Sequence, residues 1–532
     1  MNKTNENTVS GRAWAILAAM GFGALIAQMF STVIGPALPT IKDDLDLSLS
    51  MQAWTITSYS LAFGTALIAG GRLGDLVGEV RMIVIGYMVF GGGLILSAMA
   101  TSGLIMVSGR TVQGIGIGIS APATLSIVVN AFSASRCGFA VGVWGFAHGV
   151  GLLVGPVFAG YMLDLLSWRW VFWLAVPLTA AVILVTLAAT RNYYSVLSSG
   201  RYDIIGLVLG GLGITLVTYG LQNASNGWGA PSTWGALAVG VVLLALFGIV
   251  ETRTDCPLVD FSLWRERLFS GAFFAESAVG FVYIPMLTVV GSLFFIEVLG
   301  YSPVMASWVI VITTGACMVL EPPAGRLIDH IGPGIPIVAA LAMQAVALFW
   351  MGTFCPETTL GELIIPLALM GAGVGIALPA CNSAGMRTLK PEQAGMGSGL
   401  LQMTFNVPAA LGVALVTSIV GAHSLERVGT ALAGKPFLQQ ALEYAQAVKD
   451  GNDAAAAAIL KSLPSDSAEM VENAMVSAQS STIAMSMTVL GCVALAGAIM
   501  ALLIFGRRRC HEQNHLAGSV PGEARVASRD AD

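Results

Sequence analysis

Charged residues are scarce in this chain, and that scarcity sets its class. Asp, Glu, Lys and Arg make up only 10% of the 532 residues, whereas 56% are hydrophobic and the mean hydropathy is +0.79. Soluble domains contain about 25% charged residues, so the composition excludes an ordinary soluble protein. The net charge of −5 is spread over many loops without a basic patch, which argues against nucleic acid as a partner.

Cysteine patterns and phosphate-binding motifs are also missing. The seven cysteines are scattered and none forms a CxxC pair, so neither a disulfide framework nor a zinc site is expected. The glycine-rich runs lie inside apolar stretches instead of between a strand and a helix, and the sequence contains no P-loop. We therefore predict a protein that is not an enzyme and that uses no metal and no cofactor.

Long apolar stretches are what the chain has in abundance. A helix of about 20 apolar residues crosses a roughly 30 Å hydrocarbon layer, and such stretches recur from Trp14 to Phe505. We count fourteen, which predicts an all-α, multi-pass membrane protein. Their ranges are 13–36, 52–72, 82–99, 103–127, 138–162, 170–189, 203–221, 232–250, 268–296, 304–324, 335–354, 362–385, 396–421 and 484–506.

Basic residues gather in alternate connections between these stretches. Because short cytoplasmic loops are enriched in Lys and Arg, the pattern places both termini in the cytoplasm, with the protein in the plasma or inner membrane. Arg169 and the segment 422–483 depart from the pattern, and a long loop can cross largely regardless of its charge. The basic residues of the cytoplasmic connections are Arg72, Arg81, Arg136, Arg191, Arg201, Arg253, Arg265, Arg267, Arg326, Arg387, Lys390 and Arg507 to Arg509.

The sequence also contains an internal repeat. GRLGD at 71–75 matches GRLID at 325–329, and a second series of residues matches at an offset of 257. That series pairs Gly114 with Gly371, Gly116 with Gly373, Gly118 with Gly375, and Pro122 with Pro379. Two bundles built on one plan, related by an axis along the membrane normal, account for this repeat.

The repeat and the apolar stretches together predict the domain organisation. We expect a six-helix bundle over 13–190, two inserted helices over 203–250 and a second six-helix bundle over 268–506. The second bundle includes the hydrophilic segment 422–483, whose Ala-rich run should form short helices outside the bilayer. A spacer and a substrate cap are both open roles for this segment. Residues 507–532 are expected to be a polar cytoplasmic tail.

Arg110 is the one cation inside these matched segments, because Leu367 takes its place in the second copy. A cation in a membrane helix costs at least a few kcal/mol on insertion scales and often marks a substrate or proton path. Gln113 follows three residues later, so both side chains fall on one helical face and can reach the same cavity. A structural cation bound to backbone carbonyls is the alternative.

Few other titratable residues fall inside the apolar stretches. Glu276 lies about 12 Å along its predicted helix, where an ionised acid is costly, and we regard it as the preferred proton carrier. An acid held near the interface by a partner is the alternative. His148 can titrate near neutral pH or can be a neutral, packed residue. Glu321 lies one turn before the GRLID repeat and is expected at the gate.

Three motifs resemble those of a known transporter family. The loop GRLGDLVGEVR at 71–81 and the segment RTVQGIGIG at 110–118 resemble the gating loop and the proton-coupling helix of the major facilitator superfamily. The resemblance is to its 14-helix drug:proton antiporter branch in particular, which WRWVFWLAVP at 168–177 also resembles. The resemblance implies a gating site at Gly71, Arg72, Asp75, Gly78, Arg81, Arg326 and Asp329.

A fourth motif, within the stretch 138–162, resembles one that points to the direction of transport. Its spacing, GxxxxxxxxGxxxGPxxxG, is one that the family associates with antiporters, and close helix packing is the alternative reason for such glycines. In this chain the motif consists of Gly142, Gly151, Gly155, Pro156 and Gly160.

The chain departs from the family pattern at three places. Leu76, Glu79 and Val80 stand where the gating loop usually has basic residues, Phe30 stands where many drug exporters have an aspartate, and Phe405 replaces a common basic residue.

Taken together, the resemblance implies a proton-coupled exporter of amphipathic small molecules such as drugs or antibiotics, working by alternating access. Its partners are a small-molecule substrate, protons and the lipid bilayer, and it is expected to function as a monomer. A proton-coupled importer of a small metabolite and a transport-inactive membrane sensor are the alternatives.

Overall fold

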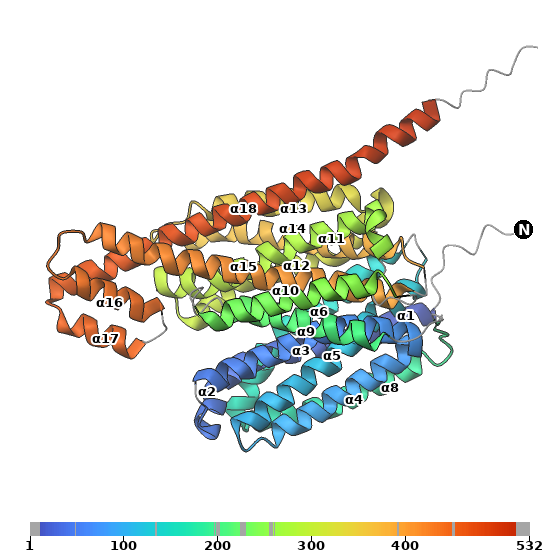
Figure 1. Cartoon of the computed structure of the whole chain (residues 1–532), viewed down its shortest axis with the longest axis horizontal. Helices are drawn as coiled ribbons and strands as arrows, with labels where there is room; N and C mark the ends of the chain where they lie inside the picture. Colours follow the sequence, from blue (N-terminus) through green and yellow to red (C-terminus); the bar gives the residue numbers. More distant parts are fainter. Residues whose placement is uncertain are drawn as a thin grey trace, which may run out of the picture.

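The computed structural model describes residues 11–47, 49–133, 136–195, 197, 203–223, 230–254, 259, 261–390, 393–449 and 453–517. Within these ranges the chain is helical and forms no strand. The long helices run side by side along one axis (Figure 1). The predicted all-α membrane fold is confirmed.

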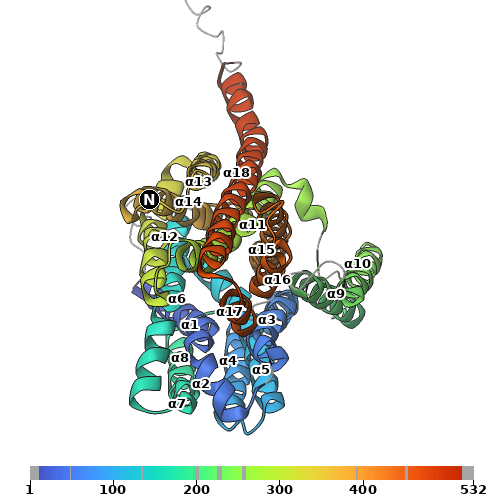
Figure 2. The same ribbon diagram turned by 90° about the vertical axis from the view of Figure 1, so that its left-hand side faces the viewer.

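The helices before residue 255 form the first bundle and the inserted hairpin. The first bundle consists of α1 (Gly11–Thr32), α2 (Ile34–Leu45), α3 (Leu49–Val77), α4 (Glu79–Ala98), α5 (Gly103–Ala131), α6 (Cys137–Leu165), α7 (Trp168–Trp173) and α8 (Ala175–Ala189). The two inserted helices are α9 (Ile204–Asn223) and α10 (Pro231–Glu251). They pair with each other at one side of the molecule, next to α3 (Figure 2).

The remaining helices form the second bundle and its outer part. They are η2 (Phe261–Arg265), α11 (Arg267–Thr288), the π-helix η3 (Val289–Val298), α12 (Pro303–Ile331), α13 (Gly334–Met351), α14 (Leu360–Met386), α15 (Ala394–Ala431), α16 (Leu438–Lys449), α17 (Asp453–Ser462) and α18 (Ser465–Ala517). We call the end of the molecule that carries the start of α1 the terminus side, and the opposite end, which carries α16 and α17, the module side (Figure 1).

Twelve helical segments of the described chain are long and apolar enough to cross a membrane. Two predicted spans are outside that set. α9 contributes only a shorter apolar run, Ile205–Leu221. α3 has 29 residues, or about 43 Å of helix, and packs against α5, α9 and α15. Counting both gives the fourteen helices expected from the sequence.

The internal repeat is visible in how the glycines pack. A Cβ added to Gly114 or Gly118 would collide with the backbone of α3, and one added to Gly116 would collide with α4. In the second copy, Gly371 and Gly375 meet α12 in the same way, whereas Gly373 meets α13. Each glycine-rich helix is therefore clamped between two neighbours, as expected where helices approach closely in lipid.

Two helices extend beyond the stretches expected from the sequence. α15 continues to Ala431 and α18 begins at Ser465, so both extend well beyond their apolar stretches. The first part of the predicted polar tail is also helical, because α18 continues to Ala517. Helices end where capping residues or packing stop them, not where apolarity stops, and Ala, Glu and Gln in these extensions are good helix formers.

The extensions of α15 and α18 meet α16 and α17 in a small helical module (Figure 1). The Ala-rich run that was predicted to be helical forms α17. The module has its own apolar core, separate from those of the two bundles. Its buried residues are Val428, Leu432, Ala441, Ala445, Val471, Met475 and Ala478.

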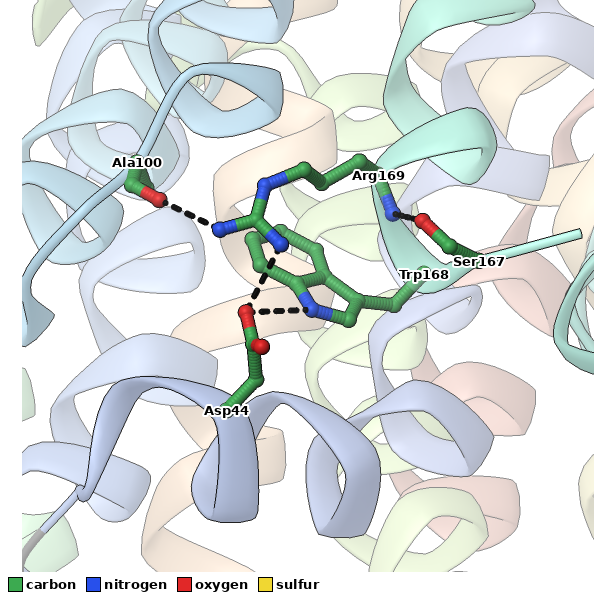
Figure 3. Close-up of polar contacts among 5 residues, drawn as sticks. All are labelled: Asp44, Ala100, Ser167, Trp168 and Arg169. Carbon is green, nitrogen blue, oxygen red and sulfur yellow. Dashed lines mark hydrogen bonds and ion pairs between the residues drawn. The ribbon is translucent and has the colours of Figure 1, made fainter.

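Arg169, which departs from the expected charge pattern, is held in an ion pair on the module side (Figure 3). Its guanidinium donates to Asp44 at 2.7 Å and to the carbonyl of Ala100 at 3.1 Å, and it lies over the ring of Trp168. The Trp168 indole also donates to Asp44, at 3.1 Å. The hydrogen bond from Arg169 holds the pKa of the Asp44 carboxyl below its ordinary value. Arg169, on α7, therefore ties α2 to the connection between α4 and α5.

The glycine packing generates a prediction about stability. Gly114→Ala places a methyl group against the α3 backbone, and overpacking of this kind costs about 1–3 kcal/mol. We expect a lower midpoint of thermal unfolding in detergent, followed by tryptophan fluorescence. Gly64→Ala, at an α3 position where an added Cβ meets nothing within 4 Å, is the control and should unfold at or above the wild-type temperature. An unchanged midpoint for Gly114→Ala contradicts the packing role.

Candidate functional site

A cavity of about 250 Å³ lies between the two bundles. Most of its wall comes from α1, α3, α4, α5 and α6, and α15 of the second bundle supplies Gln402 and Asn406. Its size is close to the lower end of the roughly 300–1,000 Å³ range of small-molecule pockets. The lining residues are Ala24, Ala27, Gln28, Ser31, Tyr59, Ser60, Phe63, Tyr87, Ile117, Ser120, Ala121, Thr124, Trp144, His148, Gln402 and Asn406.

The wall of the cavity combines aromatic rings with uncharged polar groups. Tyr59 and Phe63 stack with ring centroids 6.3 Å apart, and Trp144 stacks on His148 at 5.7 Å. Two buried donors on the wall, the indole Nε1 of Trp144 and the amide Nε2 of Gln402, have no hydrogen-bond partner among the described residues. Of the four residues predicted for proton coupling and the substrate cavity, His148 lies directly on the cavity wall, whereas Arg110, Gln113 and Glu276 do not.

Arg110 lies behind this wall and not on it. Its side chain is 1% exposed, and its guanidinium lies over the ring of Tyr59, 4.5 Å from the centroid. It donates to the carbonyls of Phe30 at 3.2 Å and Thr55 at 3.3 Å, which belong to α1 and α3. None of the described carboxylates forms an ion pair with it. Its surroundings match the alternative raised from the sequence, a cation bound by backbone carbonyls.

Gln113 lies beside Arg110, as the three-residue spacing predicted. Its amide oxygen accepts from Arg110 at 2.8 Å, and its amide nitrogen donates to Ser97 at 2.8 Å and to the Gly93 carbonyl at 3.1 Å. The counterpart of Arg110 in the second bundle, Leu367, is 1% exposed and belongs to the apolar core there. The cation therefore belongs to the first bundle alone.

Glu276 lies in the other bundle, on α11, and is 2% exposed. Its Oε1 accepts a hydrogen bond of 3.3 Å from the amide of Asn382 on α14, whereas its Oε2 has no partner in the described part of the chain. The Oδ1 of Asn382 is also without a partner. Glu276 makes no hydrogen bond to Arg110 and is not on the cavity wall. The structure therefore does not bring these two predicted residues together.

Glu321 lies at the seam where α12 packs against α6. Its Oε1 accepts from the Cys317 thiol at 3.5 Å, and its Oε2 has no partner among the described residues. A Cβ added to Gly142 would collide with the Glu321 backbone, and one added to Gly145 would collide with its carboxylate. His148, on the cavity wall, follows Gly145 by three residues on the same face of α6. Glu321 thus lies on the terminus side of the cavity.

Two aspartates close the terminus side by capping helices of the opposite bundle. Asp75, at the end of α3, accepts from the backbone N–H groups of Gly395 at 2.8 Å and Met396 at 2.9 Å, at the start of α15. Asp329, at the end of α12, accepts from Gly138 at 2.8 Å and Phe139 at 2.9 Å, at the start of α6. Carboxylates satisfy the unpaired N–H groups of a helix N-terminus and interact favourably with its dipole.

The glycines of the gating motif make these caps possible. A Cβ on Gly71 would collide with the backbone at Gly395, and one on Gly325 would collide with the backbone at Gly138. Gly78 lies between α3 and α4 at φ +108°, a backbone conformation that favours glycine. Gly71 and Gly325 therefore allow the close approach, and Asp75 and Asp329 cap the helices, in the two contacts between the bundles on the terminus side.

The basic residues of the gate have separate contacts. Arg72 is buried near Asp75, and Arg81 is exposed and donates to the carbonyl of Val77 at 3.3 Å. Arg326 lies over the ring of Phe139, 4.5 Å from its centroid, and so bridges α12 and α6. Arg387 pairs with Asp329 at 3.2 Å.

Glu79, which stands where the family usually has a basic residue, is buried and accepts from Ser126, Asn130 and Tyr193. Uncharged hydroxyl and amide donors therefore bind the carboxylate of Glu79.

The glycine motif of α6 divides between two partners. Gly142 faces α12 across the seam, whereas Gly151 and Gly155 face the α1 backbone within the first bundle. A Cβ on Gly160 would meet nothing within 4 Å, and Pro156 lies inside the helix. Part of the motif therefore packs the first bundle, and part belongs to the contact between bundles.

Sequence reasoning missed most of the cavity wall. Gln28, Gln402 and Asn406 are polar residues inside apolar stretches, which was the available signal, but uncharged amides are common packing residues. Gln402 and Asn406 are four residues apart on α15 and so share one face. Asn382, the partner of Glu276, was missed because side-chain contacts between distant helices are not visible in the order of residues.

Curated relatives resemble the chain over most of its length. It is 27% identical to the tetracenomycin C resistance and export protein of Streptomyces glaucescens, with 99% of this chain and 97% of the relative covered. It is 29% identical to the puromycin resistance protein pur8 of Streptomyces alboniger, over 77% of this chain and 82% of the relative. The multidrug efflux pump LfrA of Mycolicibacterium smegmatis is 25% identical over 93% of this chain and 97% of its own length.

Solved structures share the fold at low sequence identity. The human organic anion transporter MFSD10 superposes with a TM-score of 0.58 at 13% identity, covering 91% of this chain and 99% of that one. The proton:xylose symporter XylE gives a TM-score of 0.56 at 14% identity, covering 94% and 96%. The family model described as Major Facilitator Superfamily matches residues 20–413, which include nearly all of the first bundle, the inserted hairpin and most of the second bundle. This chain therefore belongs to the major facilitator superfamily.

Proposed function

We propose that the protein is a proton-coupled antiporter that exports amphipathic small molecules by alternating access. One observation carries this proposal: a polar cavity shared by both bundles is closed on the terminus side by a matched pair of helix caps. Several relatives have names that describe antibiotic or multidrug resistance and export, which supports the same class of cargo. The glycine motif of α6 fits an antiporter.

Proton coupling is assigned to Glu276, with Arg110 and Gln113 acting from the opposite bundle. Glu276 is buried with one carboxylate oxygen unpaired, so its ionised form lacks the partners that a charge inside a membrane normally needs. Binding and release of a proton at this residue therefore change the energy of any conformation that exposes or buries it. Asn382 supplies the one hydrogen bond that orients the carboxylate.

Gating is assigned to the seam between α6 and α12 together with the two aspartate caps. For the terminus side to open, Asp75 and Asp329 must leave the helix N-termini of the opposite bundle. Glu321 lies against Gly142 and Gly145 in the same seam, so its carboxylate must be accommodated whenever the seam closes. The glycines Gly71, Gly142 and Gly325 allow that closure.

The remaining assignments follow from the transporter proposal. The protein is placed in the plasma or inner membrane as a monomer, with both termini cytoplasmic, so that the terminus side faces the cytoplasm. The first bundle, 13–190, and the second, 268–506, move relative to each other. The inserted helices at 203–250 lie beside them, the helical module within 422–483 lies outside the cell, and 507–532 belongs to the cytoplasm.

Replacement of Glu276 tests proton coupling. Glu276→Gln keeps the shape and the hydrogen-bonding capacity of the side chain but removes the titratable proton. We expect accumulation driven by a pH gradient in inverted vesicles to fall about tenfold or more, because an intramembrane acid of this kind carries the coupling. Accumulation is measured with a panel of fluorescent amphipathic compounds, both neutral and cationic.

Glu266→Gln is the matched control, because Glu266 is exposed and directly precedes α11. It should transport like the wild type, and both variants should elute as the wild-type monomer in gel filtration. Wild-type accumulation by Glu276→Gln removes that residue from the mechanism. Failure of the wild-type protein to accumulate any compound of the panel contradicts export itself.

The gating assignment predicts different effects of two glycine substitutions on one helix. Gly145→Ala puts a methyl group against the Glu321 carboxylate and should hold the seam open, with about tenfold slower transport. Gly160→Ala is the control, since an added Cβ there meets nothing. The seam is followed by the distance between spin labels at two exposed positions on the terminus side. These are Ser133, in the connection between α5 and α6, and His330, near the end of α12. Equal distances in both variants contradict the assignment.

A further inference from the structure

The chemistry of the cavity wall indicates which cargo the transporter accepts. We infer that the cavity selects planar aromatic compounds that carry carbonyl or phenolic oxygen acceptors and no positive charge. This inference rests on the proposed export function and concerns the substrate class of the same cavity. Three observations carry it: the absence of acids from the wall, the unpaired donors on the wall, and a buried cation behind it.

Acidic side chains are absent from the described residues that line the cavity. A site that binds an organic cation in a low-dielectric setting normally supplies a carboxylate, because a charge that loses its water must be paired. Glu276 and Glu321 lie off this wall and are directed to Asn382 and Cys317. A cationic cargo would therefore find no counter-charge here.

Two donors on the wall are already desolvated and have no described acceptor. The indole N–H of Trp144 comes from the first bundle, and the amide of Gln402 comes from the second. A buried donor left without an acceptor is costly, so a ligand that offers an oxygen acceptor relieves that cost. Because the two donors lie on opposite bundles, one cargo with two oxygen acceptors can bind both of them.

The neighbouring polar side chains already have acceptors of their own. Ser120 donates to the carbonyl of Ile117, Thr124 donates to that of Ala121, and Asn406 donates to that of Gln402. These donors are therefore satisfied within their own helices. Trp144 and Gln402 carry the fully buried donors on this wall that have no partner among the described residues.

Arg110 makes the electrostatic potential of the wall positive. Its guanidinium lies over Tyr59, and Tyr59 itself lines the cavity, so one aromatic ring separates the charge from the cargo. The groups that bind Arg110 are backbone carbonyls and an uncharged amide, which leave its net charge in place. Phe30 contributes only its backbone carbonyl to Arg110, because its side chain carries no charge. A positive cargo is repelled, whereas an oxygen acceptor or an anion is attracted.

The rings of the wall favour a flat aromatic partner. Trp144 is stacked on His148, and Tyr59 is stacked on Phe63, so two pairs of rings flank the polar groups. Aromatic rings bind other rings in offset-stacked or edge-to-face arrangements. A planar compound with oxygen atoms at its edge can therefore stack on the rings and accept hydrogen bonds at the same time.

The test compares tricycles that share one shape and differ in charge. Acridone is neutral and has a carbonyl acceptor, N-methylacridinium is cationic and has none, and anthraquinone sulfonate is anionic with two carbonyls. Binding to the full-length protein in lipid nanodiscs is measured by titration, with acridone followed by its fluorescence anisotropy. We expect acridone and anthraquinone sulfonate to bind about tenfold or more tightly than N-methylacridinium, as the loss of a buried hydrogen bond requires.

Two substitutions test the donors directly. Trp144→Phe keeps a ring but removes the indole N–H, and it should weaken acridone binding by about tenfold. Gln402→Glu places a carboxylate on the wall and should reverse the preference toward N-methylacridinium. The controls are Trp308→Phe and Gln439→Glu, which change the same residue types at exposed positions away from the cavity and should leave all three affinities unchanged.

Several outcomes overturn the inference. They are tighter binding of N-methylacridinium to the wild type, binding of none of the tricycles, and an unaltered preference in both cavity variants. The nanodisc assay needs no proton gradient, so its result is independent of export. Selective binding of acridone without its accumulation in inverted vesicles would contradict the export proposal alone, and export of N-methylacridinium in preference to acridone would contradict the cargo class alone.

Discussion

The arrangement of the two bundles depends on a reciprocal pair of helix caps. Asp75 of the first bundle completes the N-terminus of α15 in the second, and Asp329 of the second completes the N-terminus of α6 in the first. A helix N-terminus has backbone N–H groups without intrahelical partners, and burying them unsatisfied is costly. Each bundle therefore supplies the acceptors that a helix N-terminus of the other bundle needs.

This dependence explains why the gating motif combines aspartate with glycine. A carboxylate reaches two adjacent N–H groups only if the backbones come close, and Gly71, Gly138, Gly325 and Gly395 are where they do. The close approach and the cap are thus one interaction. Both caps lie on the terminus side, so the proposed opening there requires a separated arrangement in which neither aspartate caps the opposite bundle.

The repeated features could be predicted from sequence because each has a local cause. Glycines recur where helices touch, aspartates recur near the ends of α3 and α12, and apolar runs recur where lipid surrounds the chain. The surroundings of Arg110 and Glu276 could not be predicted in this way. Arg110 binds the carbonyls of two other helices, and Glu276 binds Asn382 more than 100 positions away. Every residue has a backbone carbonyl, so the sequence does not show which carbonyls bind a buried cation. A cation bound by carbonyls and a cation paired with a carboxylate therefore cannot be distinguished from the sequence.

The two bundles pack their glycine-rich helices in the same way, but they carry different buried charges. Apart from Arg72, Asp75 and Glu79 at the terminus side, the first bundle holds the buried cation Arg110, whereas the second holds the buried acids Glu276 and Glu321. No ion pair among the described residues joins Arg110 to these two acids. A strong pair across the cavity would hold one arrangement at the expense of the other, because separating buried charges that are bonded is costly. Keeping the charges on separate bundles, each with neutral partners, leaves the balance between the two arrangements to the helix caps and to whatever occupies the cavity. The cargo and the proton can then shift that balance with modest binding energies.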